Sequence, residues 1–294
     1  MARRRVPLIA VATLVVAVLV ATVAVAARRP HSAEAEALAT AAPTGQFEVR
    51  GTRFFDPDGV QFVPVGTNMN GPHSFFSSPT QGMAARLKAD WGFNFIRLVT
   101  CLPGGCHGPE SSVNDDLEAI VAEYTAQRMV VMVDYHQLGF GATASPEDIA
   151  AAIEFWTDIA NRFKDNPYVW FNLFNEPEGG DGAAQRWRAQ HQPVIDAIRA
   201  TGATNIIVID DTQAGQGAAD WWSIGESPET DSGVLSEGPN LVDPVGRLAF
   251  DVHPYDVWGF PNDNDPTCAR VTPTGWRDRD CNGGFVYVPL CERD

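Results

Sequence analysis

The feature that most constrains the fold is a repeated alternation of apolar segments with amphipathic ones. Six segments have the continuous Val, Ile and Phe content of strands buried on both faces: residues 62–68, 93–100, 129–136, 168–175, 205–211 and 248–255. Four segments between them carry apolar residues at helical spacing: residues 79–91, 113–127, 146–164 and 183–200. Such an alternation predicts a parallel sheet, either open or closed into a barrel.

The third helical segment carries the clearest start signal. Ser145 is the expected N-cap, Pro146 occupies the first helical position, and Glu147 and Asp148 lie where the helix dipole favours negative charge. The sequence therefore predicts a helix that begins at Pro146.

The spacing of the predicted strands favours a barrel. Their starts recur about every 37 residues, close to the repeat of an eight-unit barrel of ~250 or more residues. An open doubly wound sheet would also accommodate six strands, but no Gly-x-Gly-x-x-Gly follows any of them. We predict an α/β fold, a (β/α)8 TIM barrel with about six of its eight βα units clearly present. Residues 272–284 contain no plausible helix, and we expect residues 271–294 to be an irregular tail of a barrel that is incomplete at its C-terminal end.

The N-terminal residues predict export. Arg3, Arg4 and Arg5 precede an apolar run at residues 6–27, within which Ala24-Val25-Ala26 suits signal peptidase. The run is longer than most signal cores, so an uncleaved anchor is the alternative. We predict a signal peptide or N-terminal membrane anchor at residues 1–30, a linker at 31–45 and a barrel domain at 46–294. The protein is then secreted, or held outside the cell by its anchor.

Charge and cysteine content narrow the class of protein. Because the formal net charge is −16, we expect no nucleic acid as a partner. Five cysteines fit an oxidising compartment. We expect two loop-stapling disulfides, Cys101 with Cys106 and Cys268 with Cys281, leaving Cys291 unpaired. The sequence has neither a Cys-x-x-Cys nor a His-x-x-x-His pair, so we expect no metal and no cofactor.

Polar residues interrupt several of the predicted strands near their C-terminal ends, where barrel enzymes keep their chemistry. The residues concerned are Arg97, His136, the pair Asn175 and Glu176, and His253 with Tyr255. A charge inside a strand needs a partner, and we predict a glutamate at this face as the partner of Arg97. Pro177 would end the fourth strand, and Gly179-Gly180 would open the next loop.

At these residues the chain resembles glycoside hydrolase family five, the cellulase family of retaining barrel glycosidases, over roughly residues 47–258. The resemblance implies that Glu176 is the general acid/base and that Asn175 binds the sugar 2-hydroxyl. It further implies that Arg97 tunes the nucleophile's charge and that His136, His253 and Tyr255 position carboxylates and substrate. Aromatic platforms for sugar rings are expected at Trp221, Trp222 or Trp258, with Trp258 as the substrate-binding residue we select.

The family's nucleophile is a glutamate that ends strand seven, and this sequence departs from the pattern there. Glu292 follows a strand-like run and is the candidate, although Pro289 would interrupt a central strand. The family's usual tryptophan at the end of strand eight has no secure counterpart.

Three hypotheses for the function follow. The first is a secreted, monomeric, retaining hydrolase of β-1,4-linked glucan or mannan, with polysaccharide or oligosaccharide as its partner. The second is a non-catalytic carbohydrate-binding relic without the nucleophile. The third is another exported barrel hydrolase that combines Glu176 with Glu178 or Asp256.

Overall fold

A computed structural model describes residues 44–70, 82–100, 117–136, 140, 144–217 and 232–253, and the backbone of residues 267–272 and 275–280. The predicted leader and all but the last two residues of the predicted linker lie outside these ranges. Within the described part of the chain, no helix is both long and apolar enough to cross a bilayer. The leader, the export and the domain limits therefore stay predictions.

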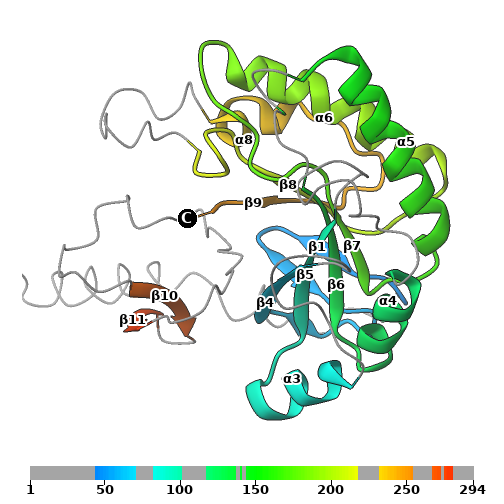
Figure 1. The fold of residues 1–294 in the computed structure, drawn as a ribbon, viewed down its shortest axis with the longest axis vertical. Coiled ribbons are helices and arrows are strands. Elements are labelled where there is room, and N and C mark those ends of the chain that lie inside the picture. Colours follow the sequence, from blue (N-terminus) through cyan, green and yellow to red (C-terminus); the bar gives the residue numbers. More distant parts are fainter. Residues whose placement is uncertain are drawn as a thin grey trace, which may run out of the picture. The chain divides into compact units, whose positions relative to one another are not determined.

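Six parallel strands form the central sheet (Figure 1): β4 (Gly66–Asn70), β5 (Phe95–Thr100), β6 (Val130–Tyr135), β7 (Val169–Asn172), β8 (Ile207–Asp210) and β9 (Leu248–Asp251). Their order in the sheet is their order in the chain, and each pairs in parallel with the next. A doubly wound sheet would reverse this order at a switch point. The sheet is therefore six successive strands of a (β/α)8 barrel, as predicted.

Helices alternate with the strands. They are α3 (Met83–Trp91), α4 (Leu117–Ala126), α5 (Pro146–Phe163) and α6 (Ala183–Ala200), followed after β8 by the short α8 (Gly233–Glu237) and the 3-10 turn η1 (Gly238–Asn240). Figure 1 shows α3 to α6 succeeding one another on one side of the sheet. Their buried side chains, including Trp156 and Trp187, form one core with the outward residues of the strands.

The predicted start of α5 is confirmed. The Ser145 side chain accepts a hydrogen bond from the Asp148 N–H, and the Asp148 side chain accepts one from the Ser145 N–H at 2.8 Å. This reciprocal capping box satisfies donors that the helix itself leaves unpaired. Pro146 stands at the start, where its missing N–H costs nothing.

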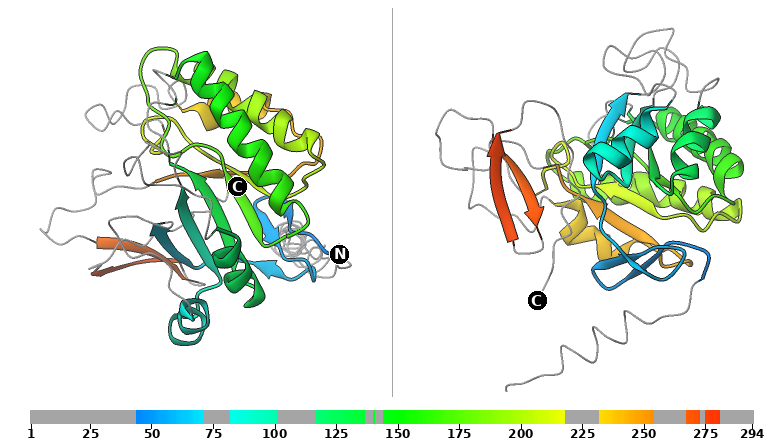
Figure 2. Two further views of the ribbon diagram at one scale, coloured as in Figure 1. Left: turned by 45° about the vertical axis from the view of Figure 1, so that its right-hand side comes forward. Right: turned by 90° about the horizontal axis from the view of Figure 1, so that it is seen from below.

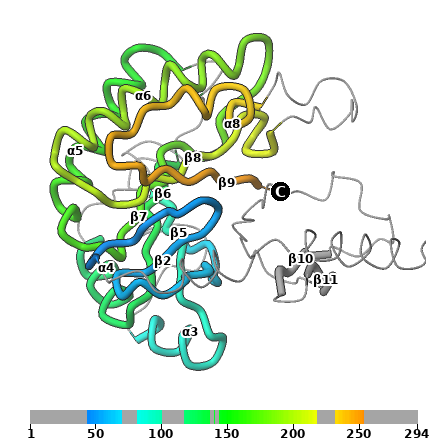
Figure 3. The backbone as a smooth tube through the Cα atoms, turned by 180° about the vertical axis from the view of Figure 1, so that it is seen from behind, coloured from blue at the N-terminus to red at the C-terminus, as the bar shows by residue number. Residues whose placement is uncertain are grey.

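A small antiparallel sheet precedes the barrel strands and consists of β1 (Glu48–Arg50), β2 (Arg53–Phe55) and β3 (Gln61–Phe62). A hairpin turn around Asp56 joins β2 and β3, and the Asp56 side chain accepts the N–H groups of Asp58 and Val60 there. Figures 2 and 3 show this blue segment lying against the six-stranded sheet. It covers one end of the sheet's inner face.

Two parts of the sequence prediction are wrong. The apolar run predicted as one strand at 62–68 is divided, with Phe62 ending β3 and Gly66 starting β4, because Pro64 cannot continue the ladder. An antiparallel hairpin, β10 (Thr267–Thr272) with β11 (Gly275–Asp280), extends into the segment predicted to be an irregular tail. The β-branched residues of β10 favour a strand.

Candidate active site

The inner face of the sheet changes from apolar to polar along each strand. Side chains alternate between the two faces of a strand, so inward residues recur every second position. The inward apolar residues pack together and against the small sheet; we call this set the apolar layer: Phe47, Phe54, Phe62, Phe95, Val130, Met132, Trp170, Ile206, Val208 and Ala249. The inward polar residues follow toward the C-terminal strand ends, and with the residues just beyond them they form the polar layer: Arg97, Asp134, Asn172, Asn175, Glu176, Asp210, Asp251 and His253.

Arg97 connects three strands of the polar layer. Its Nε donates to Asn172 Oδ1 at 2.7 Å, and its Nη2 donates to Asn175 Oδ1 at 2.9 Å. The same Nη2 lies 2.9 Å from Asp134 Oδ1 and 3.5 Å from Asp210 Oδ2. Burial by itself would lower the pKa of Arg97, but the surrounding carboxylates, Asp134 first, raise it. The guanidinium is therefore permanently charged.

The predicted partner of Arg97 was wrong. We expected a glutamate, whereas the close carboxylates are those of Asp134 on β6 and Asp210 on β8. The reason is geometric, because Arg97 lies inside the strand and reaches the aspartates within neighbouring strands. Glu176 lies beyond the end of β7 and raises the pKa of Arg97 less than Asp134, Asp210 and Asp251 do.

Asp134 also binds His136. The Nδ1 atom of His136 lies 2.7 Å from Asp134 Oδ2, and its side chain is 26% exposed. A ring nitrogen held by a buried carboxylate fixes the orientation of the imidazole. The structure therefore places His136 at the edge of the polar layer, where one side of its ring reaches solvent.

Glu176 lies just beyond the end of β7 in a left-handed backbone conformation, with φ at 49°. Its N–H donates to Asp210 Oδ2 at 3.1 Å. Its side chain is 27% exposed, whereas the side chains of Asp134 and Asp210 are fully buried. A non-glycine residue in this conformation is strained, and such strain concentrates at functional sites.

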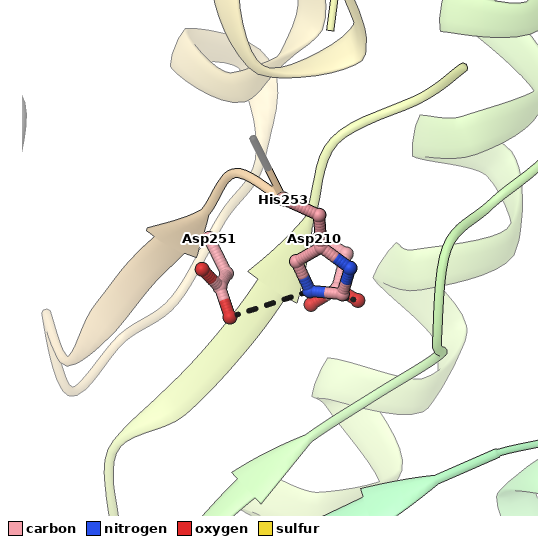
Figure 4. Close-up of side chains that lie close together, drawn as sticks. All are labelled: Asp210, Asp251 and His253. Carbon is pink, nitrogen blue, oxygen red and sulfur yellow. Dashed lines mark ion pairs between the residues drawn. The ribbon is translucent and has the colours of Figure 1, made fainter. Parts of the chain in front are cut away.

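His253 lies between three carboxylates. Its Nδ1 is 2.8 Å from Glu176 Oε1. On the other side of the ring, Nε2 is 3.3 Å from Asp210 Oδ2 and 3.6 Å from Asp251 Oδ2 (Figure 4). Burial by itself lowers the pKa of His253, but Asp210, Asp251 and Glu176 outweigh it and raise the pKa to about 10. His253 is therefore an imidazolium at neutral pH, and its Nδ1–H donates to Glu176.

Gly215 makes room for His253. A Cβ atom at Gly215 would lie 2.9 Å from Cγ of the His253 ring, and the glycine has a positive φ of 78°. The His253 N–H donates to the Gly215 carbonyl at 2.8 Å. The loop after β8 thus holds the ring against Glu176, and a larger residue at 215 would displace it.

Asp210, Asp251 and His253 are the residues of the described chain that could hold a metal ion, since one ligand atom from each lies within 4.8 Å of the others. The donor set does not suit a cation well. Asp210 Oδ2 already accepts the Glu176 N–H and lies 3.5 Å from Nη2 of Arg97. The guanidinium and the imidazolium already supply positive charge at the place where an ion would bind.

Four residues of the polar layer escaped the sequence prediction: Asp134, Asn172, Asp210 and Asp251, all fully buried. The alternation of inward and outward positions along each strand could have identified them. Each is two positions beyond an inward apolar residue, as Asp134 is beyond Met132 and Asp210 beyond Val208. A polar residue at an inward position must be paired, which marks it as part of a site.

Several predicted residues lie outside the described part of the chain. They are Tyr255, Trp258, Trp221, Trp222, Asp256, Glu292 and the cysteines 101, 106, 281 and 291, while Cys268 is described only through its backbone. The predicted aromatic platforms, nucleophile and disulfides stay predictions. Of the predicted site residues, the structure brings together Arg97, Asn175, Glu176 and His253, with His136 connected through Asp134.

Residues 55–282 match the family described as Cellulase (glycosyl hydrolase family 5). The chain is 28% identical over 233 residues to a mannan endo-1,4-beta-mannosidase of Cellvibrio japonicus, an alignment covering 77% of this chain and 49% of the relative. It is 34% identical over 128 residues to endoglucanase 1 of a Robillarda species, covering 42% of this chain and 31% of the relative. The chain thus spans about half, or less, of the length of these curated relatives.

Among solved structures, the catalytic domain of a mannanase from Streptomyces sp. SirexAA-E superposes with a TM-score of 0.55 at 26% identity, covering 75% of this chain and 65% of that one. The catalytic domain of Thermobifida fusca endoglucanase Cel5A gives a TM-score of 0.56 at 22% identity, covering 71% and 65%. The second likeness concerns the fold alone.

Proposed function

The chain belongs to the cellulase family, glycosyl hydrolase family 5, and on that premise we propose that it hydrolyses β-1,4-linked glucan or mannan. We keep both glucan and mannan as candidate substrates because the similar proteins include a mannanase and an endoglucanase. We further propose that the protein is secreted, acts as a monomer and retains the anomeric configuration of the sugar.

One observation carries the proposal. Of the four carboxylates in the described polar layer, Glu176 is the one whose side chain reaches solvent; Asp134, Asp210 and Asp251 have no exposed side-chain surface. A general acid must touch the leaving oxygen of the substrate, so Glu176 is the acid/base and the three aspartates are not. The remaining polar side chains hold it in place.

The proposed chemistry uses Glu176 twice. As an acid it protonates the leaving oxygen while a second carboxylate, about 5 Å away in retaining enzymes, attacks the anomeric carbon. As a base it then takes a proton from the water that releases the sugar. The imidazolium of His253, 2.8 Å from Oε1, stabilises the ionised form that exists between these steps. The attacking carboxylate lies outside the described residues, and Glu292 is the candidate we named for it.

Asn175 and Arg97 would prepare the sugar-binding side of the site. The Oδ1 atom of Asn175 accepts from Arg97, which orients the amide so that its NH2 group is directed away from the guanidinium. A fixed amide donor beside the acid/base suits a sugar hydroxyl. This supports the substrate-binding role proposed for Asn175.

The test is hydrolysis by the full chain of β-1,4-glucan and of β-1,4-mannan, followed by reducing-end formation and by NMR of the first anomer released. We expect turnover of at least one polymer with the β-anomer appearing first, and a loss of about 10³-fold or more in kcat for Glu176→Gln. Glu178→Gln is the matched control, since Glu178 is an exposed carboxylate two residues further on. It should retain activity within about twofold.

Each other outcome decides between the hypotheses. Binding of cello- or manno-oligosaccharides by calorimetry without turnover would favour the non-catalytic relic. Inactivity of both Glu176→Gln and Glu178→Gln would favour the hydrolase that combines Glu176 with Glu178. Full activity of Glu176→Gln on aryl glycosides would overturn the assignment of Glu176 in every hypothesis.

A further inference from the structure

We propose that Asp210 is a positioning residue that holds both the backbone and the carboxylate of the acid/base Glu176. The inference rests on the proposed function of Glu176 and goes beyond it, because Asp210 has no exposed side-chain surface and would act only through other residues. Its side chain is fully buried at the end of β8, one strand away from the strand that carries Glu176.

The first contact is with the backbone. Glu176 has a φ of 49°, a conformation that glycine adopts readily and that glutamate avoids. Its N–H donates to Asp210 Oδ2 at 3.1 Å. Hydrogen bonds to an ionised acceptor are stronger than neutral ones, so this contact can hold the strained residue. Without it, Glu176 would relax and its carboxylate would turn away from the substrate.

The second contact acts through His253. The ring donates from Nδ1 to Glu176 Oε1 at 2.8 Å, while its Nε2 faces the same Asp210 Oδ2 at 3.3 Å. Within the described residues His253 Nε2 has no hydrogen-bond partner, so Asp210 attracts the imidazolium as a charge and not through a hydrogen bond. This attraction helps to hold the ring where its Nδ1–H reaches Glu176.

Asp210 is itself rigidly held. Its Oδ1 accepts from Asn172 Nδ2 at 2.6 Å, and its carbonyl accepts from Trp187 Nε1 at 2.8 Å. The strand β8 is paired on both sides. A positioning residue must be better fixed than the group it positions, and Asp210 meets that condition.

Asp251 offers a matched contrast. It stands opposite Asp210 in the register of β8 and β9, is equally buried, and faces the same His253 Nε2 at 3.6 Å. Within the described residues, neither of its carboxylate oxygens has a hydrogen-bond partner, so it does not accept the Glu176 N–H. Both aspartates contribute charge to His253, and only Asp210 also holds the backbone of Glu176.

The experiment compares Asp210→Asn with Asp251→Asn in the full chain, using p-nitrophenyl β-cellobioside and p-nitrophenyl β-mannobioside. Among the described residues, the charged groups that face His253 are Glu176 after β7, Asp210, Asp251 and, behind Asp210, Arg97. We expect a fall in kcat of about 10²-fold for Asp210→Asn at nearly constant KM, since misplacing a reacting group by about 1 Å has that effect. Asp251→Asn should lose less than about tenfold.

A second readout is the NMR titration of the His253 ring, assigned with His253→Gln. Its pKa should fall in both aspartate variants. Equal losses of kcat in the two variants would overturn the inference while leaving the proposed function of Glu176 intact. If the wild-type chain hydrolyses no glycoside, the proposed function fails and the backbone amide signal of Glu176 decides instead. A shift of that signal in Asp210→Asn that is larger than in Asp251→Asn supports the contact, and equal shifts overturn it.

A swapped pair protects the test against misfolding. The side chain of Asp210 accepts two hydrogen bonds, one from the Glu176 N–H and one from the Asn172 amide. The amide in Asp210→Asn has one oxygen, so it can accept only one of the two. Adding Asn172→Asp restores a donor and an acceptor across the 2.6 Å contact and keeps the total charge. The double variant should recover at least about tenfold of the lost kcat. A folded double variant as inactive as Glu176→Gln would overturn the inference.

Discussion

The apolar and polar layers share the strands of the barrel and lie about two residues apart along each strand. The first consists of aromatic and aliphatic side chains, and the second consists of charged and amide side chains. In the apolar layer, Trp170 packs against Phe47, Phe54 and Phe62 with ring centroids 4.8–5.9 Å apart. In the polar layer, four carboxylates surround Arg97 and His253, leaving an excess of negative charge. Burial of the apolar layer stabilises the fold, whereas burial of the charges in the polar layer destabilises it.

The difference teaches where chemistry can be placed on a barrel. Burying several charges destabilises a fold unless the rest of it is stable enough to tolerate them. Here the apolar layer, closed by β1 to β3, lies directly beneath the charges. Changes in the apolar layer should therefore alter stability alone, and changes in the polar layer should alter stability and activity together.

The largest expected effect is that of Arg97→Met. It leaves Asp134 and Asp210 without their guanidinium partner, and breaking a buried ion pair in this way costs about 3–5 kcal/mol. Activity per folded molecule should fall as well, since Asn175 loses its orientation. Urea unfolding and a glycoside assay measure the two effects.

The control for that prediction is Arg199→Met. The Arg199–Asp243 pair, with Nε and Oδ1 at 2.8 Å, is nearly as buried but lies outside the polar layer. It should lose comparable stability with unchanged activity per folded molecule. Equal losses of activity in both variants would contradict the division into two layers.

Trp170→Ala tests the apolar layer and should affect stability alone. Removal of a large buried aromatic side chain typically costs about 3–5 kcal/mol. Well below the melting temperature, kcat of the folded fraction should stay within about twofold of wild type. Trp170→Phe provides a milder version if the alanine variant does not fold. A strong loss of kcat in a folded variant would show that the layers are coupled.

The pH dependence of stability should come from the polar layer. The pKa of His253 in the folded chain is about 10, above the unfolded value near 6.5. A raised pKa contributes stability that is complete below the unfolded pKa and is lost as pH rises through the folded one. The difference in unfolding free energy between wild type and His253→Gln should therefore shrink from pH 6 to pH 10. A difference that grows with pH would contradict the imidazolium.

The smallest expected effect is that of divalent cations. Arg97 and His253 already supply positive charge beside Asp210, so an ion at Asp210, Asp251 and His253 would meet two resident cations. Neither a chelator nor about 1 mM Mn²⁺ should shift the melting temperature by more than about 1 °C, since binding to the folded state alone would raise it. A larger rise that Asp251→Asn abolishes would establish a metal site.

Local patterns made much of the fold predictable. The five later strands and the helices α3 to α6 each overlap the predicted segment, and the start of α5 at Pro146 is reproduced to the residue. The start of the first barrel strand was misplaced and the β10–β11 hairpin was missed, because apolar content alone does not say where a proline divides a run or which strands pair.

The candidate site was predictable in part. Arg97, His136, Asn175, Glu176 and His253 were identified because each is a polar residue that interrupts an apolar run or ends it. The contacts among them were not predictable, since Arg97 and Asp210 are distant in the chain and meet only because β5 and β8 belong to one curved sheet.

By itself the sequence determined the alternation of strands and helices, the faces of those elements and the types of side chain at the strand ends. These follow from local periodicity and from the chemistry of single residues, which need no knowledge of neighbours. Only the tertiary structure decided that Asp210 binds the Glu176 N–H, that His253 stands between three carboxylates, and that Arg97 pairs with aspartates. Such contacts depend on strand order and register, where a shift of one residue would turn every inward charge to the other face.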